Sequence, residues 1–158
     1  MSETDPVVDA PVTDEAVTRV GLLLEVAAGL ATRVDAQLRR DSDITASTYE
    51  VLVRLHRSGG AKPLSALGRE LAVTTGGVTR MIDRLERDGL VRRVRSEADR
   101  RSVLAEITDA GTRTLLDALP GHVADVRDLL AALDDDQQAA LESALRTLRD
   151  ALGDQPRS

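Results

Sequence analysis

Residues 74–85 read TTGGVTRMIDRL, and the interpretation of the whole chain starts from them. At about 100° per residue the apolar side chains share one face of a helix, as expected for a segment that packs on a core: Val78, Met81, Ile82 and Leu85. The same helix opens on two glycines, and glycine in a helix interior costs about 0.8–1.0 kcal/mol relative to alanine. Gly76 falls on the outer face near Arg80, where a missing side chain lets another surface approach closely. The alternative is that Thr74 is an ordinary N-cap and that packing tolerates the glycines.

The charge distribution separates the middle of the chain from its ends. The chain of 158 residues has a formal net charge of −6, which on average argues against a nucleic-acid partner. Residues 54–101 nevertheless hold twelve basic and six acidic side chains, a local net charge of +6. A basic segment between acidic ends indicates local binding of a polyanion, although a solvated basic face without a partner gives the same count.

Composition excludes several kinds of site. The chain has no cysteine, which removes disulfides, thiolate nucleophiles and sulfur-ligated zinc. Tyr49 is the only Phe, Tyr or Trp residue, so the chain has almost no aromatic rings on which single-stranded bases could stack. A nucleic-acid partner should therefore be a duplex. Residues 1–12 lack the features of a signal peptide and no apolar run reaches 18 residues, so we expect a cytoplasmic protein.

Periodicity and cap residues predict the remaining helices. Apolar residues recur at helical spacing in five further segments, at residues 13–40, 47–58, 63–72, 109–133 and 135–152. Ser47 with Glu50 forms a capping box at the start of the second helix. Thr108 caps the fifth helix, and Asp134 with Gln137 caps the sixth.

The order of elements in the basic segment is that of a winged helix-turn-helix. After the helix at 74–88 the period changes from 3.6 to 2, which predicts a two-stranded hairpin over residues 91–107, the wing. Two short helices joined by a tight turn and followed by such a wing place the second helix in the major groove of DNA. The glycines at its start then permit close contact with phosphates and base edges.

The predicted fold class is mainly α with a small β-hairpin, a winged helix-turn-helix module flanked by N- and C-terminal dimerisation helices. The segments are a disordered tail at 1–12, an N-terminal dimerisation helix and connector at 13–46, the DNA-binding module at 47–108, C-terminal dimerisation helices at 109–153 and a tail at 154–158. The outer helices carry more apolar surface than the module can cover, so we expect a homodimer through residues 13–40, 109–133 and 135–152. An intrachain helical subdomain would use the same faces.

Two motifs resemble the MarR family of bacterial transcriptional regulators. They are LSALGRELAVTTGGVTRMIDRLERDGLVRR at 64–93 and DRRSVLAEIT at 99–108, within a resemblance that extends from about residue 13 to 152. The resemblance implies that Arg101 of the wing enters the minor groove and that Asp99 helps to hold the wing. Ala72 departs from the pattern, because many relatives have glycine after the third helix, and we expect slight strain there.

Together these observations predict sequence-specific binding of double-stranded DNA. The homodimer is expected to read a pseudo-palindromic operator through recognition helix 74–88 and wing 91–107. The predicted DNA-binding residues are Thr74, Thr75, Gly76, Gly77, Thr79, Arg80, Arg84, Arg95, Asp99, Arg100 and Arg101. Ion pairing of the arginines with Asp83, Glu86 or Asp88 on a solvated face is the structural alternative. Arg92 and Arg93 are equally compatible with phosphate contacts and with plain surface charge.

The resemblance also implies a repressor released by a small anionic or phenolic effector. Its pocket would lie between the dimer helices and the winged module, where Tyr49 and His56 are candidate ligand-binding residues and Arg33, Arg39 or Arg40 supplies charge. Each of these residues also has a purely structural interpretation. Two histidines without cysteine disfavour a metal site, and no resident cofactor is expected.

The sequence does not contain the residue patterns of a catalytic site. We find no nucleophile paired with a base and no phosphate-binding loop, and Asp134, Asp135 and Asp136 are better explained as the acidic start of a helix. The chain is therefore not expected to be an enzyme. The alternative function is a winged-helix protein-interaction module whose basic face docks an acidic protein partner.

Overall fold

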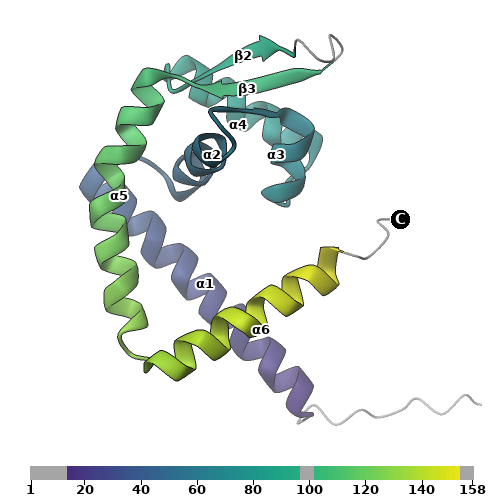
Figure 1. Cartoon of the computed structure of the whole chain (residues 1–158), viewed down its shortest axis with the longest axis vertical. Coiled ribbons are helices and arrows are strands. Elements are labelled where there is room, and N and C mark those ends of the chain that lie inside the picture. Colours follow the sequence, from purple (N-terminus) through teal and green to yellow (C-terminus); the bar gives the residue numbers. More distant parts are fainter. Residues whose placement is uncertain (1–13, 97–101, 154–158) are drawn as a thin grey trace, which may run out of the picture.

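The structure, a computed structural model, describes residues 14–96 and 102–153. Its helices are α1 (Glu15–Ser42), α2 (Ala46–Arg57), α3 (Leu64–Glu70), α4 (Thr75–Arg87), α5 (Asp109–Leu130) and α6 (Asp135–Gly153), and its strands are β1 (Ala61–Pro63), β2 (Val91–Arg95) and β3 (Val103–Ile107). In Figure 1 the elements from α2 to β3 gather at one end, the winged module, whereas α1, α5 and α6, the helical arms, extend away from it. The fold is mainly helical with one small antiparallel sheet, as predicted.

The core belongs to the winged module and to the adjoining parts of α1 and α5. The apolar face predicted for α4 is buried, with Val78 at 1% exposure and Ile82 and Leu85 at 0%. Their buried neighbours come from every element around them: Leu38, Val51, Leu52, Leu55, Leu67, Val91, Ala105 and Leu115. Because the chain has almost no aromatic residues, this core is built from aliphatic side chains alone apart from Tyr49.

The two glycines at the start of α4 have different environments. Thr74 is the N-cap, and its Oγ1 accepts a hydrogen bond from the N–H of Gly77 at 3.1 Å. A Cβ on Gly77 would lie only 3.3 Å from that same Oγ1, so the absence of a side chain at Gly77 leaves room for the capping hydroxyl. A Cβ on Gly76 would meet nothing within 4 Å, so packing within the described chain does not explain this glycine. The N-cap interpretation therefore accounts for Gly77 but not for Gly76.

The sheet has three strands, so the prediction of a two-stranded hairpin was incomplete. Strand order is β1-β3-β2, with Lys62 opposite Ala105 and Arg93 opposite Ala105 on the other side. The N–H of Ile107 also donates to the carbonyl oxygen of Gly60 at 2.8 Å. A three-residue strand that ends in proline carries no period that can be recognised, and its partner lies more than forty residues away.

The cap predictions agree with the structure except at α2. Thr108 Oγ1 accepts from the N–H of Gly111 at 3.0 Å, and Asp134 and Gln137 form the reciprocal capping box. The cap of α2 is Thr45, whose Oγ1 accepts from the N–H of Thr48 at 3.1 Å, and not Ser47. Thr45 and Ser47 both carry a hydroxyl suited to an N-cap and lie two residues apart, and the helix begins after the earlier one.

The turn between α3 and α4 carries the strain expected at Ala72. Its φ of 54° lies in the left-handed region, which glycine adopts without the clash of a Cβ. The turn directs the chain from α3 straight into the Thr74 cap of α4.

The described residues contain no helix with the length and apolar character required to cross a bilayer.

Candidate nucleic-acid interface

The outward face of α4 is clear of its own chain. Thr75, Gly76, Thr79 and Arg80 are exposed, on the opposite side from the buried Val78. The Thr79 hydroxyl donates to the Thr75 carbonyl oxygen at 2.9 Å, a bond within the helix that leaves its oxygen free to accept. Within residues 14–96 and 102–153 the side chain of Arg80 has no hydrogen bond or ion pair. This face can present a cation to a partner without first breaking a contact.

One flank of α4 is held against α2. Arg84 Nη2 donates to Ser47 Oγ at 3.2 Å, a bond between the recognition helix and the start of α2. A neutral hydroxyl does not neutralise the guanidinium, so Arg84 keeps its charge for a polyanion. Ser47, predicted as a cap, instead contacts the recognition helix and the capping hydroxyl of Thr45.

The other flank of α4 is held against the wing. Arg93 of β2 forms ion pairs with Asp83 and Glu86 of α4, at 2.6 Å each. The backbone and side-chain hydrogen bonds from Arg93 lower the pKa of Glu86 below its usual value. Asp83 and Glu86, two of the three acidic residues considered as partners for Arg80 and Arg84, therefore pair with an arginine of the wing instead.

The arginines of the wing are not equivalent. Arg92 pairs across the hairpin with Glu106 at 2.6 Å, whereas the side chain of Arg95 is exposed and has no ion pair or hydrogen bond in the described part of the chain. Arg95 lies opposite Val103, two residues beyond Arg93 and therefore on the same face of the sheet as Arg93. Asp99, Arg100 and Arg101, the predicted residues of the wing tip, lie outside the described residues.

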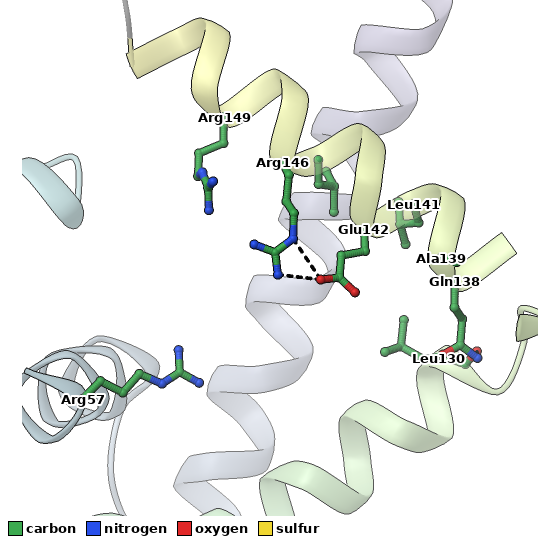
Figure 2. A pocket seen from close by; sticks show the side chains of 9 residues that line it. Arg57, Leu130, Gln138, Ala139, Leu141, Glu142, Arg146 and Arg149 are labelled. Carbon is green, nitrogen blue, oxygen red and sulfur yellow. Dashed lines mark hydrogen bonds and ion pairs between the residues drawn. The ribbon is translucent and has the colours of Figure 1, made fainter. Parts of the chain in front are cut away.

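The helical arms leave large apolar side chains uncovered. The exposed fractions are 55% for Val20, 64% for Leu24, 43% for Leu145 and 75% for Leu152. An open cavity of about 790 Å³ lies beside α6, with Leu130 and Leu141 among its lining. Figure 2 shows Arg146 paired to Glu142 within this lining. An isolated chain of this kind exposes surface that water disfavours.

The two candidate effector residues do not share one environment. Tyr49 is 7% exposed and its ring lies 4.6 Å from that of His122 of α5, whereas His56 is exposed. Each arginine expected to supply charge is paired with a carboxylate, Arg33 with Asp125, Arg39 with Asp35 and Arg40 with Asp41. Tyr49 and His122 thus form a contact between the winged module and the arms that the sequence did not predict.

Comparison with known proteins identifies the family. A family model described as the MarR family matches residues 44–103. The regulator YkoM of Bacillus subtilis is 33% identical over 131 residues, which cover 81% of this chain and 84% of that protein. The chain belongs to the MarR family. MhqR of the same organism is 32% identical, but the match spans only 61% of its length and 56% of this chain.

Solved structures of MarR-family regulators extend the likeness to the arms. AbsC of Streptomyces coelicolor superposes with a TM-score of 0.82 at 30% identity, covering 90% of this chain and 97% of its own. Sco3205 of the same organism, whose structure contains DNA, gives a TM-score of 0.81 at 31% identity over 91% of this chain and 94% of its own. The family assignment therefore includes the arrangement of α1, α5 and α6.

Sequence reasoning missed the contacts that fix α4 in place. Thr79, Asp83 and Glu86 recur every three to four residues, so they line one flank of the helix, and this spacing is visible in the sequence. That Arg93 faces this flank follows from the register of β2, since Arg93 shares its face with the buried Val91. The alternation of β2 was predicted, but its orientation towards α4 depends on tertiary packing.

Proposed function

We propose that this chain is a transcriptional regulator that binds a pseudo-palindromic operator as a homodimer and releases it on binding a small effector. The observation that carries the proposal is the outward face of α4, held on both flanks and presenting an unpaired Arg80 beside Gly76. The family membership supports it, and the structure of Sco3205 was determined with DNA. No second function is favoured by a specific feature of the described residues.

The two halves of the interface have different roles in this proposal. Arg80 and the exposed start of α4 approach base edges in the major groove, which gives sequence specificity. Arg84 and Arg95 contact phosphates, which fixes the register of the protein on the duplex. Arg101 enters the minor groove beside the wing, and Asp99 holds the wing loop.

A second copy of the chain covers the apolar surface of the arms. Two-fold pairing places two α4 helices about one helical turn of DNA apart, roughly 34–36 Å, and so reads two half-sites. It also brings the acidic arms together on the side away from the DNA, which leaves the basic winged modules as the surface that attracts phosphates.

The effector is proposed to bind where the winged module meets α1 and α5. Tyr49 is the better placed of the two candidates, because it contacts His122 across that junction. Two buried polar atoms nearby in the fold, Gln37 Oε1 and His122 Nδ1, have no hydrogen-bond partner among the described residues. Unsatisfied buried polar atoms disfavour an apolar occupant, so the proposed effector carries hydrogen-bonding groups.

Salt titration of DNA binding tests the main proposal. A duplex selected from a random library with the wild-type protein, and a shuffled duplex of the same composition, are compared between low and moderate salt. We expect a steep log-log salt dependence for both and an excess affinity of about 10³-fold or more for the selected duplex. Absence of any excess would favour an acidic protein as the partner.

Two variants then test the assigned contacts. Arg101→Ala should weaken binding to the selected duplex by roughly 1–3 kcal/mol. Gly76→Leu should abolish close docking while leaving the fold intact, because nothing lies within 4 Å of the added Cβ. Full affinity in either folded variant would contradict the contact assigned to that residue.

A further inference from the structure

Arg93 connects the wing to the recognition helix through both its side chain and its backbone. Its Nη2 lies 2.6 Å from Asp83 Oδ1 and donates to the Thr79 carbonyl oxygen at 3.3 Å. Its Nη1 lies 2.6 Å from Glu86 Oε2, and its backbone N–H donates to Glu86 Oε1 at 2.9 Å. One strand residue thus holds three successive positions along a flank of α4.

The direction of the Arg93 side chain is set by the sheet. Arg93 lies between Val91 and Arg95 on β2 and opposite Ala105, and both Val91 and Ala105 are buried. The side chain is therefore on the inner face, towards α4. Because β2 is an edge strand of the sheet, its outward N–H groups need partners, and Glu86 supplies one.

We propose that Arg93 is a positioning residue that makes α4 and the wing one rigid DNA-reading unit. The inference rests on the proposed function, because it concerns how two DNA-contacting elements keep their spacing. In the proposed function the major-groove contacts come from α4, and the wing contacts come from Arg95 at the end of β2 and from the residues that follow it. A wing that rotates about its base would lose the second set of contacts while the first persisted.

Direct binding of Arg93 to phosphate is disfavoured by its surroundings. The Arg93 side chain is only 27% exposed, and its guanidinium has two carboxylates within 2.6 Å, so the cluster has a net negative charge. Arg92, the adjacent residue, is 65% exposed and paired only within the hairpin to Glu106. Arg92 therefore carries the same charge on the same strand without linking the wing to α4, which makes it a matched control.

The sign of the effect of removing a carboxylate separates the two roles. Glu86→Gln and Asp83→Asn each remove a negative charge near the DNA, so simple electrostatics predicts equal or tighter binding of the selected duplex. If Arg93 positions the wing, both variants weaken binding, by about 10-fold for Glu86→Gln, as expected for charged groups in one network. Arg93→Gln should weaken binding at least as much, and Arg92→Gln clearly less.

Hydroxyl-radical footprinting and hydrogen exchange complete the test. In Glu86→Gln and Arg93→Gln, protection of the DNA by the wing should be lost while protection by α4 remains. In the free protein the amide of Arg93 should exchange faster in Glu86→Gln, with the amides of α4 unchanged. Tighter or unaltered binding by Glu86→Gln and Asp83→Asn, or uniform loss of both protections, would overturn the proposal.

This design distinguishes failure of the inference from failure of the proposed function. If the wild-type protein shows no excess affinity for any selected duplex, the function fails, and the exchange measurement still decides whether Glu86 holds the wing. Asp83 is 51% exposed on its side chain, so Asp83→Asn gives a folded variant even if Arg93→Gln does not. Arg93→Lys keeps one charge and should restore part of the lost affinity.

Discussion

Leucine side chains are buried in the winged module but exposed on the helical arms. Leu52, Leu55 and Leu85 of the module are fully buried, whereas Leu24 of α1 is 64% exposed and Leu148 of α6 is 48% exposed. The core of the module is formed by its own residues together with the adjoining turns of α1 and α5 in the same chain. The arms leave these leucines exposed, and in the proposed homodimer a second chain covers them.

Charge follows the same division. The basic residues concentrate between residues 54 and 101, while the chain as a whole has a net charge of −6. The arginines of the module fall into two groups. Arg92 and Arg93 are paired with carboxylates, whereas the side chains of Arg80 and Arg95 have no such partner among the described residues. In the proposed function, binding of DNA and pairing of two chains therefore reside in different parts of the molecule, so single substitutions should affect one without the other.

The largest effect is expected from a charge in the apolar face of α6. Leu145→Glu removes about 1.5–3 kcal/mol of burial per side chain and does so twice in a two-fold dimer, roughly 3–6 kcal/mol in all. The dissociation constant of the dimer, measured by analytical ultracentrifugation, should rise about 10²- to 10⁴-fold. Operator binding should fall with it, while the circular dichroism of the winged module persists.

Ser143→Glu is the matched control for this variant. Ser143 is exposed on the opposite face of α6, two residues before Leu145, so the added charge should leave the dimer intact. A Leu145→Glu protein that remains a dimer at nanomolar concentration would contradict the division between module and arms.

The next effect concerns the joint between the two regions. A Cβ on Gly111, in the first turn of α5, would lie 2.1 Å from the carbonyl oxygen of Leu90, which is a backbone atom and cannot rotate away. Gly111→Ala should therefore lower the free energy of unfolding by about 2–3 kcal/mol, measured by urea denaturation, despite the better helix propensity of alanine. Gly76→Ala, with open space around it, should gain up to about 1 kcal/mol. Equal effects of the two substitutions would show that α5 does not require this close approach.

Local signals made much of the fold predictable from sequence. The apolar stripe of α4 and the caps Thr74, Thr108 and Asp134 depend on residues within four positions of one another, and the structure confirms them. Non-local contacts were not predictable in the same way. Strand β1 is recognisable only through its pairing with β3, and the close approach of Gly111 to Leu90 depends on where α5 packs.

The candidate site was predictable as a segment but not residue by residue. Sequence placed Arg80 and Arg93 in the same basic stretch, and only the packing of β2 against α4 shows that one is free and the other is neutralised. Tyr49 was predicted as a candidate effector-binding residue, but its contact with His122 depends on how α2 meets α5. The assignments of DNA-binding and effector-binding residues remain predictions for the experiments above.

The smallest effect is expected inside the winged module, at the strained turn before α4. Ala72 has a φ of 54°, which costs an L-residue about 1–2 kcal/mol, whereas glycine adopts it freely. Part of the gain from Ala72→Gly is offset because glycine adds roughly 0.4–1 kcal/mol of conformational entropy to the unfolded chain. The free energy of unfolding should therefore rise by about 0.5–1 kcal/mol in urea denaturation.

Ala66→Gly is the control for this variant, because Ala66 lies within α3. The lower helix propensity of glycine should reduce the free energy of unfolding by about 1 kcal/mol. If Ala72→Gly destabilises the protein as much as Ala66→Gly, the turn is not strained. If it stabilises the protein as expected, operator affinity indicates whether the turn also sets the position of α4. Unchanged affinity would show that the contacts of Arg84 and Arg93 on the two flanks suffice to hold the recognition helix, independently of the chain that enters it.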